Sequence, residues 1–248
     1  MNKKNSGAYG FTPIGVVHSC FKEKFGIPRQ PGLVPEAKAT LEILAPFNRC
    51  EAIGGLDGFS HIWVIFVFHA VMRDQWRPTV RPPRLGGNQR VGVFASRSPF
   101  RPNPVGLSLV KLETIECDGE RCLLQLSGAD ILDGTPVMDI KPYLPYAEAL
   151  PEAEGGYASG YPEHSISVSF STLAESQCAE LEGKGQPGLR RLIEQVLSQD
   201  PRPAYYADGK HQDEHNKSKP GRAFIQPFQR IKIIGSAGNN FELKKVIV

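Results

Sequence analysis

The sequence predicts a mainly β protein in which a small β-barrel domain is followed by a small α+β domain. Gly (25) and Pro (21) together make up nearly a fifth of the 248 residues, which favours many turns and short strands over long helices. Up to about residue 148, short apolar segments follow one another without helical patterns between them. Such a succession is typical of a barrel or a closed sheet.

Six segments of the first domain have the composition of strands. The most apolar of them, Ser60–Val71 (SHIWVIFVFHAV), is rich in β-branched and aromatic residues, so we expect a central strand that is buried on both faces. Val105–Cys117 and Cys122–Leu126 flank an Asp118-Gly119 turn and predict a β-hairpin. The remaining predicted strands are Phe11–Cys20, Ala39–Ala45 and Val91–Ala95.

A segment rich in Gly, Pro and small residues separates the two predicted domains. We place the first domain at residues 1–148, the linker at 149–164 and the second domain at 165–248, because PEAEGGYASGYPEH at 151–164 has the composition of an interdomain linker. The second domain is expected to contain a strand, two amphipathic helices and a terminal hairpin around GNN: Ser165–Phe170, Thr172–Glu182, Leu189–Gln199, and Ala223–Ile234 with Phe241–Val248.

The composition argues against several classes of protein. There is no run of about 18 apolar residues that would predict a membrane span, and MNKKNSGAYGF at the start lacks the apolar region of a signal peptide. The five cysteines are scattered without a CxxC pair, so we expect neither a disulfide framework nor a zinc site, and a reducing cytoplasmic location is favoured. The motifs GxSxG, HExxH and GxxxxGKS/T do not occur.

One glycine motif matches the sequence of a dinucleotide-binding pattern but lacks the structural context that this pattern requires. GKGQPG at 183–188 fits GxGxxG, but that motif requires a preceding strand and a helix that begins at the pyrophosphate. The preceding residues, LAESQCAELE, have a helical pattern. We therefore expect this segment to join two helices and predict no Rossmann-type cofactor site.

Arginines are concentrated in one part of the first domain. From residue 73 to residue 103 there are seven of them (73, 77, 81, 84, 90, 97 and 101), no lysine, and one acid, Asp74. Guanidinium groups form paired hydrogen bonds with phosphate and carboxylate, so this clustering indicates recognition of anions or nucleic acid. A solvated loop is the alternative, although solvated faces usually mix lysine with acids.

The segment FASRSPFRPNPVG at 94–106 is the clearest candidate for a binding loop. Its three prolines restrict the backbone and hold Arg97, Arg101 and Asn103 in preset directions, which lowers the entropy cost of binding. A proline-stabilised crossover loop is the alternative. Two further segments share this character: FGIPRQPGL at 25–33, with Arg29 and Gln30, and DILDGTPVMDIKPY at 130–143, with Asp130, Asp133, Asp139 and Lys141.

Three carboxylates and two histidines have more than one interpretation. Asp130, Asp133 and Asp139 lie within ten residues and suggest a divalent metal. The nearby arginines disfavour a cation, however, and no further acidic cluster completes a ligand shell, so we expect no metal. His61 and His69 flank the long apolar segment, where each is either a hydrogen-bonded structural residue or part of a pocket wall.

Several long motifs, in the same order, resemble those of the TrmO family. They are PRQPGL at 28–33, GLDGFSHIWVIFVFH at 55–69, RPPRLGG at 81–87, GVFASRSPFRPNPVGLS at 92–108 and DGTPVMDIKPYLPYAE at 133–148. The resemblance covers nearly all of residues 11–148 and is looser in the second domain, where DPRPAY at 200–205 carries it. It implies a dimer of small, non-Rossmann β-barrels that binds S-adenosylmethionine (SAM) near the subunit interface.

The resemblance also implies a reaction. Bacterial members of the family transfer the methyl group of SAM to N6 of threonylcarbamoyladenosine at position 37, beside the anticodon of threonine tRNA. Methyl transfer requires alignment of donor and nucleophile, together with a base or water that accepts the N6 proton. Asp133 and His69 are the candidate catalytic residues. A base of the anticodon loop is single-stranded and enters a pocket without opening a duplex.

The same motifs assign site residues. By resemblance, SAM contacts fall on Pro28, Arg29, Gln30, His69, Arg97, Leu107, Asp133, Gly134 and Thr135. We expect substrate or tRNA contacts at Arg84, Arg101, Asn103, Lys141, Tyr143, Arg202 and Arg222. The second domain is expected to assist tRNA binding through its basic residues, which also include Lys217, Lys219, Arg230 and Lys232.

Two other functions are compatible with these residues. A SAM-responsive RNA-binding protein without catalysis would use SAM as an effector. A phosphate-ester hydrolase would use the three aspartates with a metal ion. Methyl transfer to tRNA distinguishes an enzyme from the first alternative, and metal-dependent phosphatase activity would reveal the second.

Overall fold

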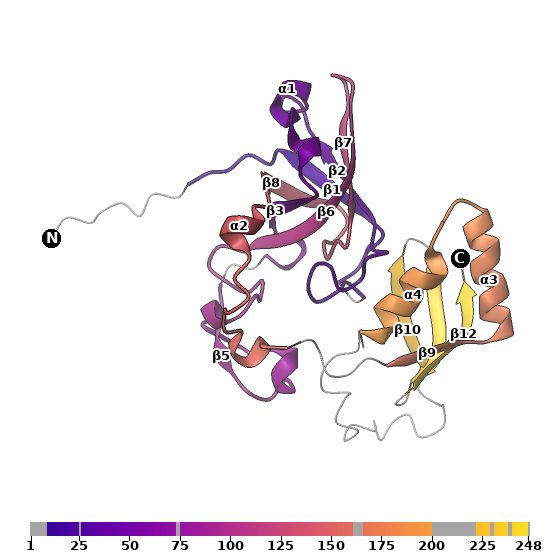
Figure 1. Cartoon of the computed structure of the whole chain (residues 1–248). Helices are drawn as coiled ribbons and strands as arrows, with labels where there is room; N and C mark the ends of the chain where they lie inside the picture. Colours follow the sequence, from indigo (N-terminus) through magenta and orange to yellow (C-terminus); the bar gives the residue numbers. More distant parts are fainter. Residues whose placement is uncertain are drawn as a thin grey trace.

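The chain forms a six-stranded barrel, a second unit with two helices on a four-stranded sheet, and a separate two-stranded sheet (Figure 1). The computed structural model describes residues 9–24, 26–72, 75–160, 166–199, 222–228, 231–237 and 240–247. Within these ranges, none of the helices has both the length and the apolar character needed to cross a bilayer. The predicted fold class, a mainly β barrel followed by an α+β unit, is confirmed.

Six antiparallel strands close the barrel in the order β1-β2-β7-β6-β3-β8. The longest ladder pairs β3 with β6, from His61 opposite Lys111 to Val67 opposite Val105. Closure between β1 and β8 gives every strand two neighbours, so the barrel presents no open sheet edge. The strands are β1 (Gly15–Ser19), β2 (Ala39–Ile43), β3 (His61–Val67), β6 (Val105–Cys117), β7 (Cys122–Ser127) and β8 (Thr135–Pro142).

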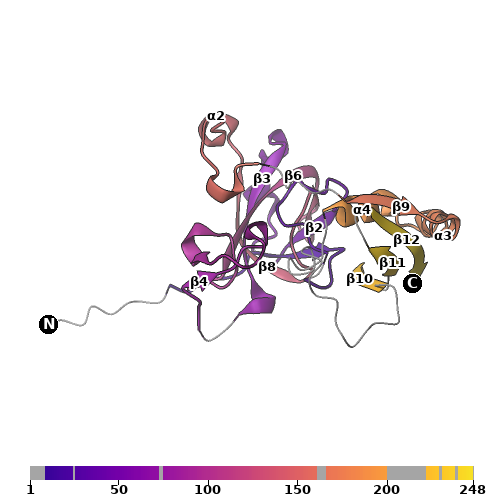
Figure 2. The same ribbon diagram turned by 90° about the horizontal axis from the view of Figure 1, so that it is seen from below.

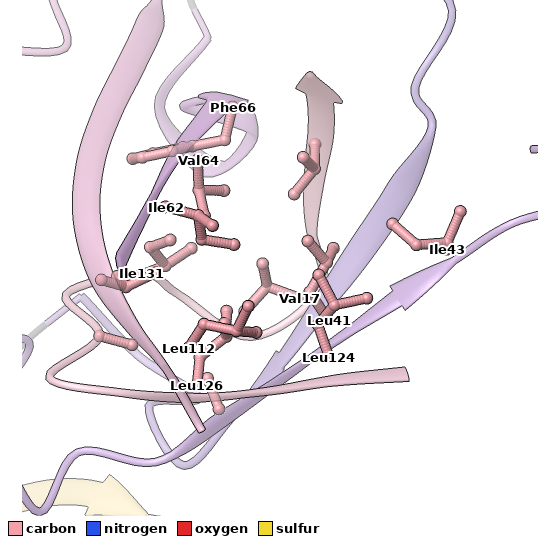
Figure 3. Packing of buried hydrophobic residues seen from close by; sticks show 14 of the residues in the cluster. Val17, Leu41, Ile43, Ile62, Val64, Phe66, Leu112, Leu124, Leu126 and Ile131 are labelled. Carbon is pink, nitrogen blue, oxygen red and sulfur yellow. The ribbon is translucent and has the colours of Figure 1, made fainter. Parts of the chain in front are cut away.

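Alternate residues of the barrel strands fill its interior (Figure 3). In β3, Ile62, Val64 and Phe66 are buried, whereas the residues between them are partly exposed. The prediction that this strand is buried on both faces is therefore wrong, because the outer wall of a barrel has no second sheet packed on it. A later segment contacts its outer face, where Nε1 of Trp63 donates a hydrogen bond to Oε1 of Glu148 at 2.7 Å.

Two predicted strands are shorter than their sequence patterns. β3 ends at Val67, and His69 begins the 3-10 helix η2 (His69–Val71). The segment at 91–95 is not a barrel strand: β5 (Val91–Gly92) pairs with β4 (Thr79–Val80) in the separate sheet, and η4 (Val93–Ala95) follows. Prolines at 78, 82 and 83 limit β4 to two residues, because proline lacks the N–H that a strand ladder needs.

The predicted hairpin is confirmed, whereas β8 was not predicted. At the hairpin turn, the backbone N–H groups of Glu120 and Arg121 donate to Oδ1 of Asp118 at 2.9 and 2.8 Å, and Gly119 has a φ of 93°. β8 pairs with both β1 and β3 and thereby closes the barrel. Pro136 and the polar residues at 139 and 141 obscure its alternating pattern in the sequence.

The second unit has both helices on the same face of its sheet (Figure 2). The strand order is β10-β11-β12-β9, with β9 parallel to β12. Oγ of Ser171 accepts a hydrogen bond from the N–H of Ala174 at 3.2 Å and so caps the first helix. The elements are β9 (Ser167–Phe170), α3 (Thr172–Gly183), α4 (Leu189–Ser198), β10 (Arg222–Phe228), β11 (Ile231–Ala237) and β12 (Asn240–Ile247).

Two sequence predictions about this unit are confirmed and one is wrong. The glycine motif at 183–188 joins α3 to α4, and β11 and β12 form a hairpin around GNN. The single strand predicted at 223–234 is instead divided into β10 and β11, which pair antiparallel. The ladder is irregular between Ile225 and Phe228, next to Pro227, where a ladder N–H is missing.

The barrel and the second unit share a hydrophobic core. The loop between β1 and β2 contributes three fully buried side chains to it: Phe21, Val34 and Ala37. They belong to one cluster with the helices, in which Ile193 of α4 is also fully buried. In addition, the backbone N–H of Glu36 donates to the amide oxygen of Gln195 at 3.1 Å. The second unit therefore supports the loop that also carries the PRQPGL motif.

Candidate cofactor and nucleic-acid site

Two adjoining cavities lie next to the barrel, bordered by the Arg-Pro loop. The smaller has a volume of about 460 Å³ and the larger about 1340 Å³. Their linings have five residues in common: Arg29, Gln30, Ser96, Arg97 and Pro99. Nη1 of Arg97 donates a hydrogen bond to Oε1 of Gln30, so the Arg-Pro loop and the PRQPGL loop are joined in the wall between the two cavities.

The barrel supplies one side of the small cavity through facing residues of β3 and β6. Phe66 lies directly opposite Gly106, and a β-carbon at Gly106 would lie 2.3 Å from the ring carbon Cζ of Phe66. Glycine is therefore required for the ring to lie across the strand. The rings of Phe66 and Phe68 pack edge to face, with centroids 5.1 Å apart. Leu107 and Ser108 continue this wall.

Asp130 is the only acid among the described residues that line either cavity. Oγ of the buried Ser108 donates to Oδ1 of Asp130 at 2.5 Å. Burial raises the pKa of this carboxyl to about 6, while the hydrogen bond from Ser108 and the charge of Arg97 act in the opposite direction. From the sequence, Asp130 was considered only as a possible metal ligand in the segment 130–143 and not as a cofactor or substrate residue. A usable signal was its position between the apolar residues Ala129 and Ile131, both of which are buried.

His69 presents a polar atom that lacks a partner. In the described part of the chain, Nδ1 of His69 is the one buried side-chain nitrogen or oxygen without a hydrogen bond. The side chain lines the small cavity. An unsatisfied buried polar group costs about 1–3 kcal/mol, so a polar group of a bound molecule would relieve this cost.

The structure brings together seven of the nine residues that the resemblance assigns to SAM. Lining the small cavity are Pro28, Arg29, Gln30, His69, Arg97, Leu107 and Thr135. The other two, Asp133 and Gly134, do not line it. Asp133 accepts from the backbone N–H of Ser19 at 2.9 Å and pairs with Lys22 at 2.7 Å, and the N–H of Gly134 donates to the carbonyl of Val17. These contacts fix the entry into β8.

The residues assigned to substrate or tRNA are dispersed. Arg84 lines the large cavity and Arg101 the small one. Nη1 of Arg101 donates hydrogen bonds to the carbonyls of residues 96 and 98 at 3.0 and 3.3 Å. The Arg101 side chain therefore also stabilises the Arg-Pro loop to which it belongs. Asn103, Lys141 and Tyr143 line neither cavity; Lys141 pairs with Asp139 at 2.9 Å. Outside the described residues or side chains lie Arg202, Lys217, Lys219, Arg222, Arg230 and Lys232.

The three aspartates do not converge on one point. Asp130 bonds to Ser108, Asp133 to Lys22 and Asp139 to Lys141. No group of three potential ligands that could hold a metal ion occurs in the ranges that the structure describes. The metal-dependent hydrolase therefore has no supporting arrangement in these residues.

The large cavity is lined by guanidinium groups. Six arginines contribute to it, including three that the sequence analysis placed in the cationic cluster without assigning them individually: Arg77, Arg81 and Arg90. Arg77 and Arg81 flank β4, Arg84 lies in the 3-10 helix η3 (Pro83–Leu85), and Arg90 precedes β5. The segment after the barrel completes the wall: Tyr157 donates to the carbonyl of Ala95 at 2.9 Å, and Arg84 donates to the carbonyl of Gly160. Such a surface attracts phosphate.

The fold and the two cavities define a barrel protein with a cavity of small-molecule size beside a larger cavity lined by arginines. Within this class, the chain belongs to the tRNA-methyltransferase O family. Residues 16–149 match the family's N-terminal domain, and residues 163–217 match the TrmO C-terminal domain.

Individual relatives agree with this assignment. The tRNA (adenine(37)-N6)-methyltransferase of Escherichia coli (strain K12) is 54% identical over 198 residues, which cover 80% of this chain and 84% of the relative. A putative S-adenosylmethionine-dependent methyltransferase, RcsF, of Pseudomonas aeruginosa is 48% identical over 216 residues, 87% of each chain. A crystal structure of TrmO superposes with a TM-score of 0.78 at 37% identity and covers 98% of this chain and 100% of that one.

Proposed function

We propose that this chain transfers the methyl group of SAM to N6 of adenosine 37 in tRNA, and that the adenosine is threonylcarbamoylated and belongs to threonine tRNA. The observation that carries the proposal is the shared wall: a cofactor-sized cavity adjoins a guanidinium-lined one through Arg97. A donor in the first cavity and a phosphate-bearing acceptor in the second would meet at this wall. Proximity of this kind is the main requirement of methyl transfer.

The small cavity fits SAM in size and chemistry. Its volume of about 460 Å³ is within the range of small-molecule sites. Aromatic and aliphatic side chains suit the adenosine part, and the basic and hydrogen-bonding residues suit the amino-acid part. When bound, SAM supplies an activated methyl group on a sulfonium. The residues of this chain would hold SAM, keep water away from it and fix the direction of its methyl group.

The large cavity suits the anticodon loop of tRNA. The arginines that line this cavity and not the small one, Arg77, Arg81, Arg84 and Arg90, would neutralise phosphates. A single-stranded base can leave its stack at modest cost and enter a pocket. The carboxylate of a threonylcarbamoyl group would find a bidentate partner in any of these guanidinium groups. The guanidinium groups therefore support the choice of a tRNA base that carries an additional anionic group as the substrate.

The proton on N6 must be accepted as the methyl group arrives. His69 lies at the small cavity with an unpartnered Nδ1, and we propose it as the proton acceptor. Asp133, the other candidate, has its carboxylate engaged by Lys22 and by the backbone of Ser19, which supports a role in positioning β8. A water molecule held by His69 would serve the same purpose.

The proposal includes a homodimer in the cytoplasm. Leu107 and Val105, beside the small cavity, are 46% and 40% exposed, and exposed apolar side chains at a cavity mouth favour burial by a second copy. Residues 1–148 would form the catalytic unit, with 165–248 assisting tRNA binding across the linker at 149–164. Sedimentation of an active protein that is monomeric at all concentrations would contradict the dimer.

Mass spectrometry of tRNA nucleosides after incubation with the protein and SAM tests the reaction. We expect the position-37 nucleoside of threonine tRNA to gain one methyl group, and tRNA that lacks the threonylcarbamoyl group to remain unmodified. Binding of SAM without transfer would favour the alternative, an RNA-binding protein for which SAM is an effector. The Arg97→Ala variant should lower SAM affinity or turnover, since Arg97 lines both cavities.

A further inference from the structure

The position of Asp130 raises a question that the proposed reaction leaves open. Among the described residues, the other ionisable groups that line the small cavity are all basic: Lys24, Arg29, His69, Arg97 and Arg101. A cavity built only for an anion would not need a carboxylate, and a partly buried carboxylate such as that of Asp130 is costly to maintain. The single acid in this wall therefore indicates a ligand that brings a positive charge as well as a negative one.

Asp130 is held in place for such contact. It follows β7, and the hydroxyl of Ser108 on β6 fixes one carboxylate oxygen at 2.5 Å. Ser108 is buried in the barrel wall, so it cannot turn toward solvent. Arg97 reaches the same cavity from the Arg-Pro loop and acts on Asp130 electrostatically. An acid and a guanidinium thus face one small space.

An α-amino acid carries an ammonium and a carboxylate on one carbon atom, which matches this pair of opposite charges. We propose that Asp130 and Arg97 together bind the zwitterionic amino-acid end of SAM, with Asp130 accepting hydrogen bonds from its ammonium and Arg97 donating to its carboxylate. This inference rests on the proposed function, since it assumes that SAM occupies the small cavity. It adds Asp130 to the site as a cofactor-binding residue.

The proposed contact with the ammonium of SAM also accounts for the different partners of the three aspartates. Asp133 and Asp139 already pair with Lys22 and Lys141, whereas Asp130 is bonded to a neutral hydroxyl. A carboxylate that a neutral donor holds in place keeps its negative charge available for a ligand. Charge-assisted hydrogen bonds of this kind are the stronger ones in proteins.

Calorimetric titration of the full-length protein with three ligands tests the inference. SAM and S-adenosylhomocysteine both carry the amino-acid end, and 5′-methylthioadenosine lacks it. For Asp130→Asn we expect SAM and S-adenosylhomocysteine to bind about 10- to 100-fold more weakly, with the affinity for methylthioadenosine unchanged. Asp139→Asn, an equal change of charge outside both cavities, is the matched control and should bind all three ligands as the wild type does.

Other outcomes would overturn the inference. A loss confined to SAM would place Asp130 at the sulfonium, a loss for all three ligands would place it at the adenosine, and unchanged affinities would remove it from the cofactor. Arg97→Ala provides a second variant and should show the same pattern as Asp130→Asn. If the wild-type protein binds no SAM at all, the proposed function itself fails, which is distinguishable from a failure of this assignment.

Discussion

The two cavities share a wall but differ in charge, and this difference separates their tasks. Counting only residues whose placement is described, the small cavity combines aromatic rings and a single carboxylate with its basic residues, whereas the large one is lined by six arginines and no acid. A mixed-charge wall selects a small molecule by the geometry of its groups. A wall of one sign attracts a polyanion over a longer distance and with less geometric demand.

The difference also has a structural origin. The wall of the small cavity includes barrel strands, where ladder pairing sets each side chain within a rigid frame, as for Phe66 opposite Gly106. The wall of the large cavity consists of two-residue strands, 3-10 turns and the segment at 157–160. Rigid elements suit a site that must align a reacting group, and loops suit contact with an irregular nucleic-acid backbone.

The largest effect should come from a residue that touches neither cavity. Ile193→Ala removes a fully buried side chain from the core shared with the β1–β2 loop, and we expect the free energy of unfolding to fall by about 2–5 kcal/mol. Because that loop carries Arg29 and Gln30 to both cavities, affinities for SAM and tRNA should fall together. Leu173→Ala, at an exposed position of α3, is the control. A loss for one ligand alone would show that the shared support is unimportant.

Asp130→Asn should stabilise the protein while it weakens SAM binding. A folded-state pKa of about 6 against an ordinary value of 3.8 corresponds to about 3 kcal/mol of destabilisation at neutral pH. Since the pKa is raised, this destabilisation is absent below about pH 4 and develops as pH rises through about 6. Chemical denaturation at several pH values should therefore show a gain of about 1–3 kcal/mol for the variant at pH 7 and little difference at pH 4. Equal stability at both pH values would argue against a desolvated carboxylate.

Removing charge from the large cavity alone should affect tRNA and not SAM. We expect the double variant Arg81→Ala/Arg84→Ala to bind tRNA about 10-fold more weakly at low salt, and the slope of log affinity against log salt to decrease by about 1–2. Its affinity for SAM should be unchanged. Arg49→Ala/Arg121→Ala removes the same charge from residues that line neither cavity and serves as the control. Equal losses in the two double variants would indicate a general charge effect.

The smallest effect should appear in the pH dependence of SAM binding. An ionised Asp130 is needed to pair with an ammonium, so affinity should decrease as pH falls through its pKa of about 6. The hydrogen bond from Ser108 lowers that pKa, and Ser108→Ala should therefore move the midpoint to higher pH and weaken SAM binding a few-fold at pH 7. Calorimetry across pH 5–8 measures this shift. A midpoint at lower pH would contradict the proposed role of Ser108.

Predictions from the sequence were strongest where local patterns decide the outcome. Alternating apolar residues identified most barrel strands, and Asp118-Gly119 identified the hairpin. The three proline-rich and glycine-rich segments were recognised as candidate loops, and residues of all three line the small cavity. β8 was missed because Pro136 and charged residues interrupt its pattern, although pairing on both sides makes it a strand.

The individual site residues could be predicted only in part. The motif DGTP drew attention to Asp133, yet local contacts with Ser19 and Lys22 engage that side chain. Asp130, three residues earlier, lines the cavity instead. Its surroundings depend on Ser108, which is distant in sequence and becomes its partner only when β6 and β7 pair. Burial and charge at a site are properties of such non-local neighbours.

The amino-acid sequence by itself determined the class of fold, the order of the units and the family. Strand patterns, turn residues and long motifs are formed by residues that are neighbours in the chain, so they can be recognised without knowing how the chain packs. Only the tertiary structure decided which residues face one another. It joined Arg97 to Gln30, left Nδ1 of His69 unpaired and placed one carboxylate among basic groups. These relations follow from closure of the barrel, which sets distant strands side by side and so decides which charges are buried together.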